Sequence, residues 1–145
     1  MLYQAVDLTD GKKYAVGGLI GFEFAEDLGA SDYNGPAFSW QTKVSLITST
    51  LLSGAKYRVG YSYGWRYSST ARDFLGRVRI APSTVVMNHR QEPKDGAADQ
   101  IARVSGWVYL DGADASETIE LQWTSQNAGD IATISEARLE IWRVQ

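Results

Sequence analysis

The sequence of 145 residues contains no cysteine, which excludes a disulfide framework and a thiolate metal site. It has no long apolar run and no basic, apolar leader at its start, so neither a membrane span nor a signal peptide is expected. No block of like charge occurs either. The 14 basic and 17 acidic residues give a net charge of -3, which argues against nucleic acid as a partner. We therefore expect a chain made and assembled in a cytoplasm.

Sequence signatures of catalysis are also missing. The single histidine, His89, stands beside no serine or cysteine motif, and a surface loop explains it better than base catalysis does. Asp111, Asp114 and Glu117 do not have the spacing of a calcium-binding loop, and hairpin turns account for them. We predict no enzyme, no cofactor and no metal site. A hydrolase with paired carboxylates stays an alternative, because sheet partners cannot be read from one sequence.

What the chain does have, from residue 38 to its end, is a period of two. Apolar residues alternate with polar ones in six segments, each typical of a half-buried strand. Turn clusters such as Asp111-Gly112 separate the segments, and 145 residues fit one domain. The pattern predicts an all-β fold, an antiparallel β-sandwich or barrel. The residues predicted to face inward are Phe38, Trp40, Val44 and Leu46; the odd positions of 57–67; Phe74, Gly76, Val78 and Ile80; Ala102, Val104, Gly106, Val108 and Leu110; Ile119, Leu121 and Trp123; and Ala137, Leu139 and Ile141.

The segment YRVGYSYGWRY, residues 57–67, is the richest in aromatic rings. Its odd positions hold tyrosine, valine and tryptophan, whereas its even positions hold arginine, glycine and serine. Because one face must pack, we predict that the odd face forms part of the core, where each large side chain contributes roughly 1.5 to 3 kcal/mol. The alternative is a platform for sugar rings. If the odd face is in the core, its four tyrosine hydroxyls need buried partners, which contacts in an oligomer would supply.

The first 37 residues differ from the rest, because glycines at positions 17, 18, 21, 29 and 35 interrupt any long element. The stretch LIGFEF offers one short apolar run. We predict an extended N-terminal segment over residues 1–37 with one short strand, lying as an arm on a neighbouring subunit. Residues 38–145 then form the sandwich.

Several aromatic and charged residues fall on the opposite parity from the predicted core. Large rings that point outward mark protein contacts, unless twist, a bulge or a covering segment buries them within one subunit. The candidate interface residues are Trp107, Tyr109, Arg138, Glu140 and Trp142.

The stretches VSLITSTLLSGAKYRVGYSYGWRYSS, DFLGRVRI, NHRQEPKDGAADQ, VSGWVYL and ATISEARLEIWRV resemble the jelly-roll structural proteins of tailed bacteriophage virions. That group includes capsid decoration (cement) proteins and fibre or spike domains. The resemblance covers residues 38–145 and rests on the order of aromatic strands. It implies a jelly-roll-like sandwich that commonly trimerises and attaches to a shell or a tail, and it brings no catalytic residues.

The function expected from the resemblance is that of a non-enzymatic virion protein. A decoration protein that binds the major capsid protein and stabilises the shell through many repeated contacts is the first expectation. The partners expected are further copies of the chain, as a homotrimer, and another virion protein. A fibre or spike domain that binds a receptor carbohydrate is the alternative.

Overall fold

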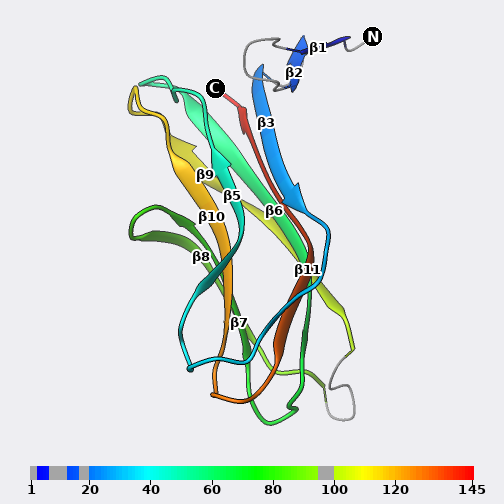
Figure 1. Ribbon diagram of the computed structural model, residues 1–145. Coiled ribbons are helices and arrows are strands. Elements are labelled where there is room, and N and C mark those ends of the chain that lie inside the picture. The colour runs from blue at the N-terminus through cyan, green and yellow to red at the C-terminus, as the bar shows by residue number, and fades with distance from the viewer. Residues whose placement is uncertain (1–2, 7–12, 17–19, 95–99) are drawn as a thin grey trace.

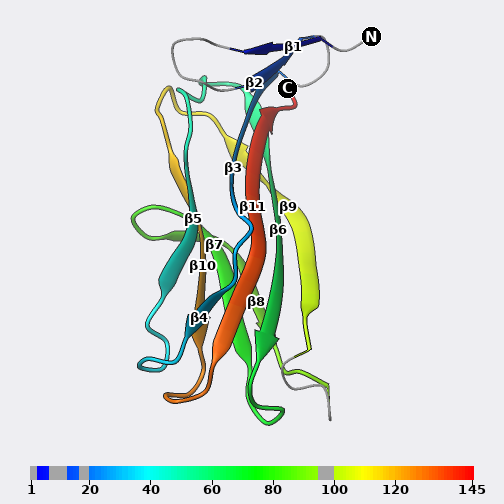
Figure 2. The ribbon, with the colours of Figure 1, turned by 45° about the vertical axis from the view of Figure 1, so that its right-hand side comes forward.

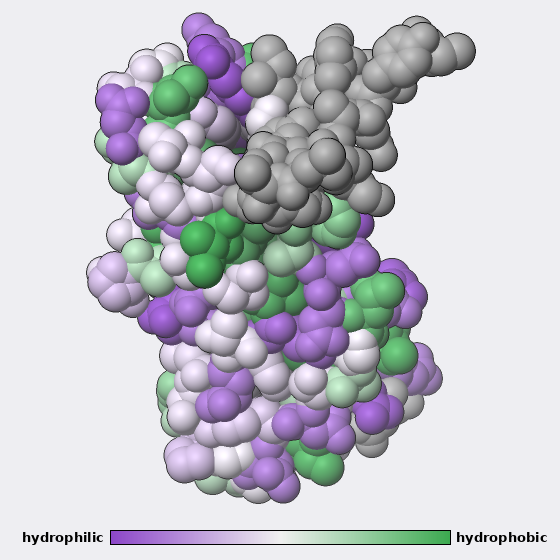
Figure 3. Space-filling view, turned by 45° about the horizontal axis from the view of Figure 1, so that its top comes forward, coloured by the Kyte–Doolittle hydropathy of each residue, from purple (hydrophilic) through white to green (hydrophobic). Residues whose placement is uncertain are grey.

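The computed structural model describes residues 3–6, 13–16, 20–94 and 100–145, and every regular element in this part of the chain is a β-strand. Two antiparallel sheets pack face to face as a sandwich (Figures 1 and 2), which confirms the predicted fold class. No helix within these residues has the length and apolar character needed to cross a membrane. On the face in Figure 3, apolar residues reach the surface in separate groups among polar ones.

The strands divide unequally between the sheets. The four-stranded sheet has, in spatial order, β5 (Gln41–Ile47), β10 (Thr118–Ser125), β7 (Phe74–Ile80) and β8 (Thr84–Gln91). The five-stranded sheet has β3 (Ile20–Asp27), β11 (Ala132–Arg143), β6 (Lys56–Tyr67) and β9 (Ala102–Asp111), while β4 (Ser31–Tyr33) pairs with the start of β11. Strands β1 (Tyr3–Val6) and β2 (Lys13–Val16) form a separate hairpin at the end of the molecule where the C-terminus lies (Figure 2).

The odd face of β6 lies in the core, as predicted. Val59, Tyr63, Trp65 and Tyr67 are buried, and the Trp65 ring stacks on Phe74 of the opposite sheet with centroids 5.1 Å apart. Tyr61 is only half-buried, because the sandwich is less closed beside edge strand β9, whose inward residues are also half-buried. The aromatic segment is therefore mainly a wall of the core rather than a ligand platform.

Three of the four tyrosine hydroxyls of residues 57–67 find partners within this chain. Tyr57 Oη accepts a hydrogen bond from Leu52 N (2.9 Å), and Tyr63 Oη lies 2.8 Å from Nδ1 of His89. Tyr67 Oη lies 2.8 Å from Ser125 Oγ. Burial raises the pKa of Tyr63, which keeps its hydroxyl protonated.

His89 was predicted to lie in a surface loop, and this was wrong. It lies in strand β8, half-buried against the rings of Tyr63, Trp65 and Phe74. Its polar neighbours in NHRQEPKDG hid the strand, because β8 is an edge strand and only one of its faces meets the core.

A bulge in β11 sets which of its residues face inward. The pairing with β6 shifts between Ser135 and Arg138, and Glu136 adopts a φ of 49° there. An extra residue in one strand reverses the parity beyond it. Ile134 on one side, and Leu139 and the rest of the predicted set on the other, are therefore all buried.

A second bulge corrects the prediction for the residues before β5. Val44 and Leu46 are buried as predicted, but Phe38 is 57% exposed and Trp40 lies against Arg77 on the outer face. The register between β5 and β10 shifts at Lys43, so residues on its two sides face opposite ways. The prediction was wrong for Phe38 and Trp40 because it continued the alternation past Lys43, where the alternation reverses.

The described part of the first 37 residues contains four strands rather than one. Strands β3 and β4 both pair with β11, so residues 20–33 belong to the five-stranded sheet. On β3, the buried Glu23 carboxylate accepts hydrogen bonds from Ser49 N at 2.9 and 3.1 Å and so ties this strand to the turn after β5. The sandwich thus begins well before the predicted boundary at residue 38.

Candidate ligand-binding site

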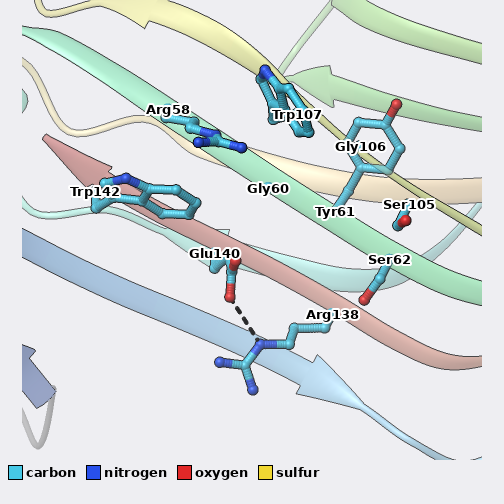
Figure 4. Close-up of a pocket in the computed structure, with 10 residues that line it drawn as sticks. All are labelled: Arg58, Gly60, Tyr61, Ser62, Ser105, Gly106, Trp107, Arg138, Glu140 and Trp142. Atoms are coloured by element: carbon cyan, nitrogen blue, oxygen red, sulfur yellow. Dashed lines mark hydrogen bonds and ion pairs between the residues drawn. The ribbon is translucent and has the colours of Figure 1, made fainter. Parts of the chain in front are cut away.

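The outer face of the five-stranded sheet carries a pocket of about 250 Å³, here called the outer-face pocket (Figure 4). It is built by β6, β9 and β11, the three strands that lie side by side at the centre and one edge of the sheet. Its lining residues are Arg58, Gly60, Tyr61, Ser62, Ser105, Gly106, Trp107, Arg138, Glu140 and Trp142.

Strand register explains why these residues meet. Directly opposed residues of an antiparallel pair point to the same face, so each cross-strand row presents its side chains together. Three successive rows across β11, β6 and β9 run Trp142–Arg58–Tyr109, Glu140–Gly60–Trp107 and Arg138–Ser62–Ser105. Small residues occupy the middle of the lower two rows, and large side chains stand around them.

Gly60 forms the lowest part of the pocket floor. An added Cβ there would lie 3.0 Å from Cγ and Oε1 of Glu140, so any side chain would displace Glu140 or fill the pocket. On the other side of the row, Trp107 is 56% exposed. The glycine therefore leaves a space with an indole on one side and a carboxylate on the other.

Arg58 stands between two indoles at one end of the pocket (Figure 4). Its Cζ lies 4.1 Å from the ring centroid of Trp107 and 5.2 Å from that of Trp142. These cation–π contacts hold the guanidinium in place. Its Nε is buried and has no hydrogen-bond partner among the described residues.

Arg138 and Glu140 are held more firmly at the opposite side. Arg138 Nε donates to Glu140 Oε2 (3.2 Å), and its Nη1 donates to Glu26 Oε2 (3.0 Å). The guanidinium also covers the ring of Phe24 at 4.4 Å. This network orients Glu140 toward the pocket and engages Nε and Nη1 of Arg138 in hydrogen bonds within the chain.

The pocket contains four of the five interface residues predicted from the sequence: Trp107, Arg138, Glu140 and Trp142. Tyr109 points to the same face and is 56% exposed, but it lies outside the lining. Sequence reasoning missed Arg58, Gly60, Ser62 and Ser105. The signal was present in the even positions of residues 57–67, and only the register showed that these positions lie between the tryptophans.

The pocket presents both apolar and polar groups to a ligand. Two indoles offer flat apolar faces, and a guanidinium, a carboxylate and two serine hydroxyls offer polar contacts. Within the ranges that the structure describes, no group of three or more His, Asp or Glu side chains is placed to hold a metal ion.

No protein-family model matches this sequence, and no curated protein sequence matches it. Solved structures do share the fold. VP2 of infectious bursal disease virus, in a subviral particle, aligns with a TM-score of 0.56 and 9% identity over 97% of this chain and 38% of that chain.

Two further solved structures to which the chain is similar are dimeric latent PorU from Porphyromonas gingivalis and the C-terminal domain of the sugar-binding protein EclA. PorU aligns with a TM-score of 0.56 and 12% identity over 88% of this chain and 13% of that chain. EclA aligns with a TM-score of 0.48 and 10% identity over 78% of both chains. The chain thus spans well under half the length of VP2 and PorU, and the alignments with these two structures establish a jelly-roll-like β-sandwich.

Proposed function

We propose that the chain is a non-enzymatic carbohydrate-binding domain of a bacteriophage virion, of the fibre or spike type. The observation that carries the proposal is the outer-face pocket, in which two indoles flank polar side chains over a floor of glycine and serine. Sugars present an apolar ring face and a rim of hydroxyls, and an aromatic wall beside fixed polar groups matches both.

The assignment to a virion is supported by two weaker observations. The chain resembles phage jelly-roll proteins in its strand sequence, and its fold is shared with VP2 of a viral particle. Fold does not determine function. The pocket, rather than the fold, therefore supports the choice between the functions considered.

A glycan array followed by titration of the best sugars tests the proposal. Trp107→Ala and Trp142→Ala should each weaken binding about tenfold or more, because each removes one wall of the pocket. The matched control is Trp40→Ala. Trp40 also stacks on an arginine at 4.1 Å, but on the outer face of the other sheet, so this variant should bind normally. A protein that binds no glycan, or loses binding equally in all three variants, contradicts the proposal.

The second candidate is a decoration protein that contacts other virion subunits. It is favoured by Trp107 and Tyr109, which are exposed side by side along edge strand β9. Exposed large rings at a sheet edge suit a protein interface. This candidate includes the homotrimer expected from the sequence.

Light scattering during size-exclusion chromatography tests the second candidate. A trimer that Trp107→Ser with Tyr109→Ser converts to monomer would support it. Ile47→Ser is the control, because Ile47 is 64% exposed on β5 in the four-stranded sheet. A wild-type monomer at micromolar concentration would count against it.

A further inference from the structure

Arg58 is a cation whose polar partners are missing from the part of the chain that the structure describes. It makes no ion pair and no hydrogen bond there, and its contacts are the two indoles of Trp107 and Trp142. Arg138, two rows away on the same face, is by contrast paired with Glu26 and Glu140. The outer-face pocket therefore has an uncompensated positive charge at one end only.

The surroundings of Arg58 strengthen any interaction with an anion. The indoles exclude water from one side of the guanidinium, and its buried Nε has lost water without gaining an acceptor. A planar guanidinium offers parallel N–H donors that match a carboxylate in a two-point contact. A ligand carboxylate would pair with the part of the Arg58 guanidinium that the indoles leave uncovered, since the side chain as a whole is only half-buried.

The rest of the pocket indicates what the carboxylate is attached to. Next to Arg58 along β6 comes Gly60, with the Trp107 ring on one side and Oε1 of Glu140 on the other. The row after that presents the hydroxyls of Ser62 and Ser105. Rows lie roughly 7 Å apart along a strand, so a six-membered ring bound at Arg58 would extend into the row of Gly60, between the Trp107 ring and the Glu140 side chain.

We propose that the outer-face pocket selects an acidic sugar, a uronic or sialic acid type, whose carboxylate pairs with Arg58. The ring lies in the row of Gly60, between Trp107 and the Glu140 side chain, and its hydroxyls donate to Glu140 and exchange hydrogen bonds with Ser62 and Ser105. The proposal rests on the carbohydrate-binding function proposed above. Glu140 repels a doubly charged phosphate in the same place more strongly than a singly charged carboxylate, because like charges would stand in adjacent rows.

The test compares oligosaccharides that differ only in charge. Calorimetric titration is carried out with oligogalacturonate, its neutral galactose counterpart and a sulfated counterpart. The uronate should bind at least about tenfold more tightly than either of the other two. Arg58→Met should abolish this preference while leaving weak binding of the neutral sugar. Raising the salt concentration should reduce the preference in the native protein.

Arg66→Met is the matched control, because Arg66 lies on the same strand and the same parity but outside the pocket. It removes the same charge and should leave the preference intact. Thermal unfolding of both variants checks that each is folded. If Arg58→Met keeps the preference, or the sulfated sugar binds as tightly as the uronate, the acidic-sugar proposal is overturned.

Two further outcomes separate this proposal from the function on which it rests. Equal binding of neutral and acidic sugars overturns the role of Arg58 and leaves carbohydrate binding standing. Binding of neither class overturns both proposals. If an acidic peptide then binds directly and Arg58→Met abolishes that binding, the pocket is assigned to a carboxylate of a partner protein.

Discussion

The outer face of each sheet carries an arginine stacked on a tryptophan ring, but the hydrogen bonds of the two arginines differ. On the four-stranded sheet Arg77 lies 4.1 Å from the ring centroid of Trp40, and on the five-stranded sheet Arg58 lies 4.1 Å from that of Trp107. Arg77 Nε also donates to Oε1 of Gln122 at 2.9 Å, whereas Arg58 Nε has no such acceptor among the described residues.

The difference extends to the neighbours of each arginine. Around Arg77, Gln122 also donates to Thr42, and Arg79 pairs with Glu120, so polar groups are satisfied across the sheet. Around Arg58 the neighbouring row has glycine at its centre. A closed polar network of this kind stabilises the surface of the four-stranded sheet. The proposed ligand would complete the open network beside the outer-face pocket.

The largest expected effect comes from adding one methyl group to a glycine of each sheet. At Gly76 in β7 an added Cβ would lie 2.5 Å from Oη of the buried Tyr63, so Gly76→Ala should cost about 1 to 3 kcal/mol by overpacking. At Gly60 it would meet only the end of Glu140 at 3.0 Å, and Gly60→Ala should cost less. Urea unfolding of both variants measures the difference, and equal costs would mean that the pocket floor is as tightly packed as the core.

The next effect separates the two arginines. Arg77→Met leaves Oε1 of the buried Gln122 without its donor and should cost about 1 to 3 kcal/mol. Arg58→Met loses two cation–π contacts but also removes a buried Nε that has no acceptor, so its cost should stay within about 1 kcal/mol. Chemical denaturation of the two variants in the absence of ligand checks this. A larger loss for Arg58→Met would show that Arg58 serves the fold.

The smallest expected effect is a dependence of stability on pH, caused by His89, which lies half-buried between the two sheets. Burial lowers the pKa of His89 below the ordinary 6.5, so the unfolded chain takes up a proton at a higher pH than the native protein does. The contribution of His89 to the free energy of unfolding is therefore fully present above pH 6.5 and decreases as the pH falls below this value. Denaturant midpoints between about pH 7.5 and about pH 5 should show the decrease, and His89→Gln should flatten it. A native protein whose stability is constant over this range would contradict the assignment.

Sequence alternation predicted the inward faces of β6, β7, β10 and most of β11 correctly, because side chains of a strand point alternately to the two faces. It failed at Phe38 and Trp40, beyond the bulge at Lys43. The alternation also placed Trp107 and Trp142 outward. It gave no means of placing Arg58 between them, because that contact depends on two pairings between segments far apart in the chain.

Composition and period alone determined that this protein is an all-β sandwich without disulfides, with an aromatic wall inside and large rings outside. Those properties are local, since each residue's face follows from its neighbours in sequence. The tertiary structure decided the register of β11, β6 and β9, the bulges that reverse parity, and hence the outer-face pocket. If either pairing shifted by one residue, the side chains of one strand in each cross-strand row would point to the opposite face of the sheet. The pocket therefore exists only because non-local packing fixes the register.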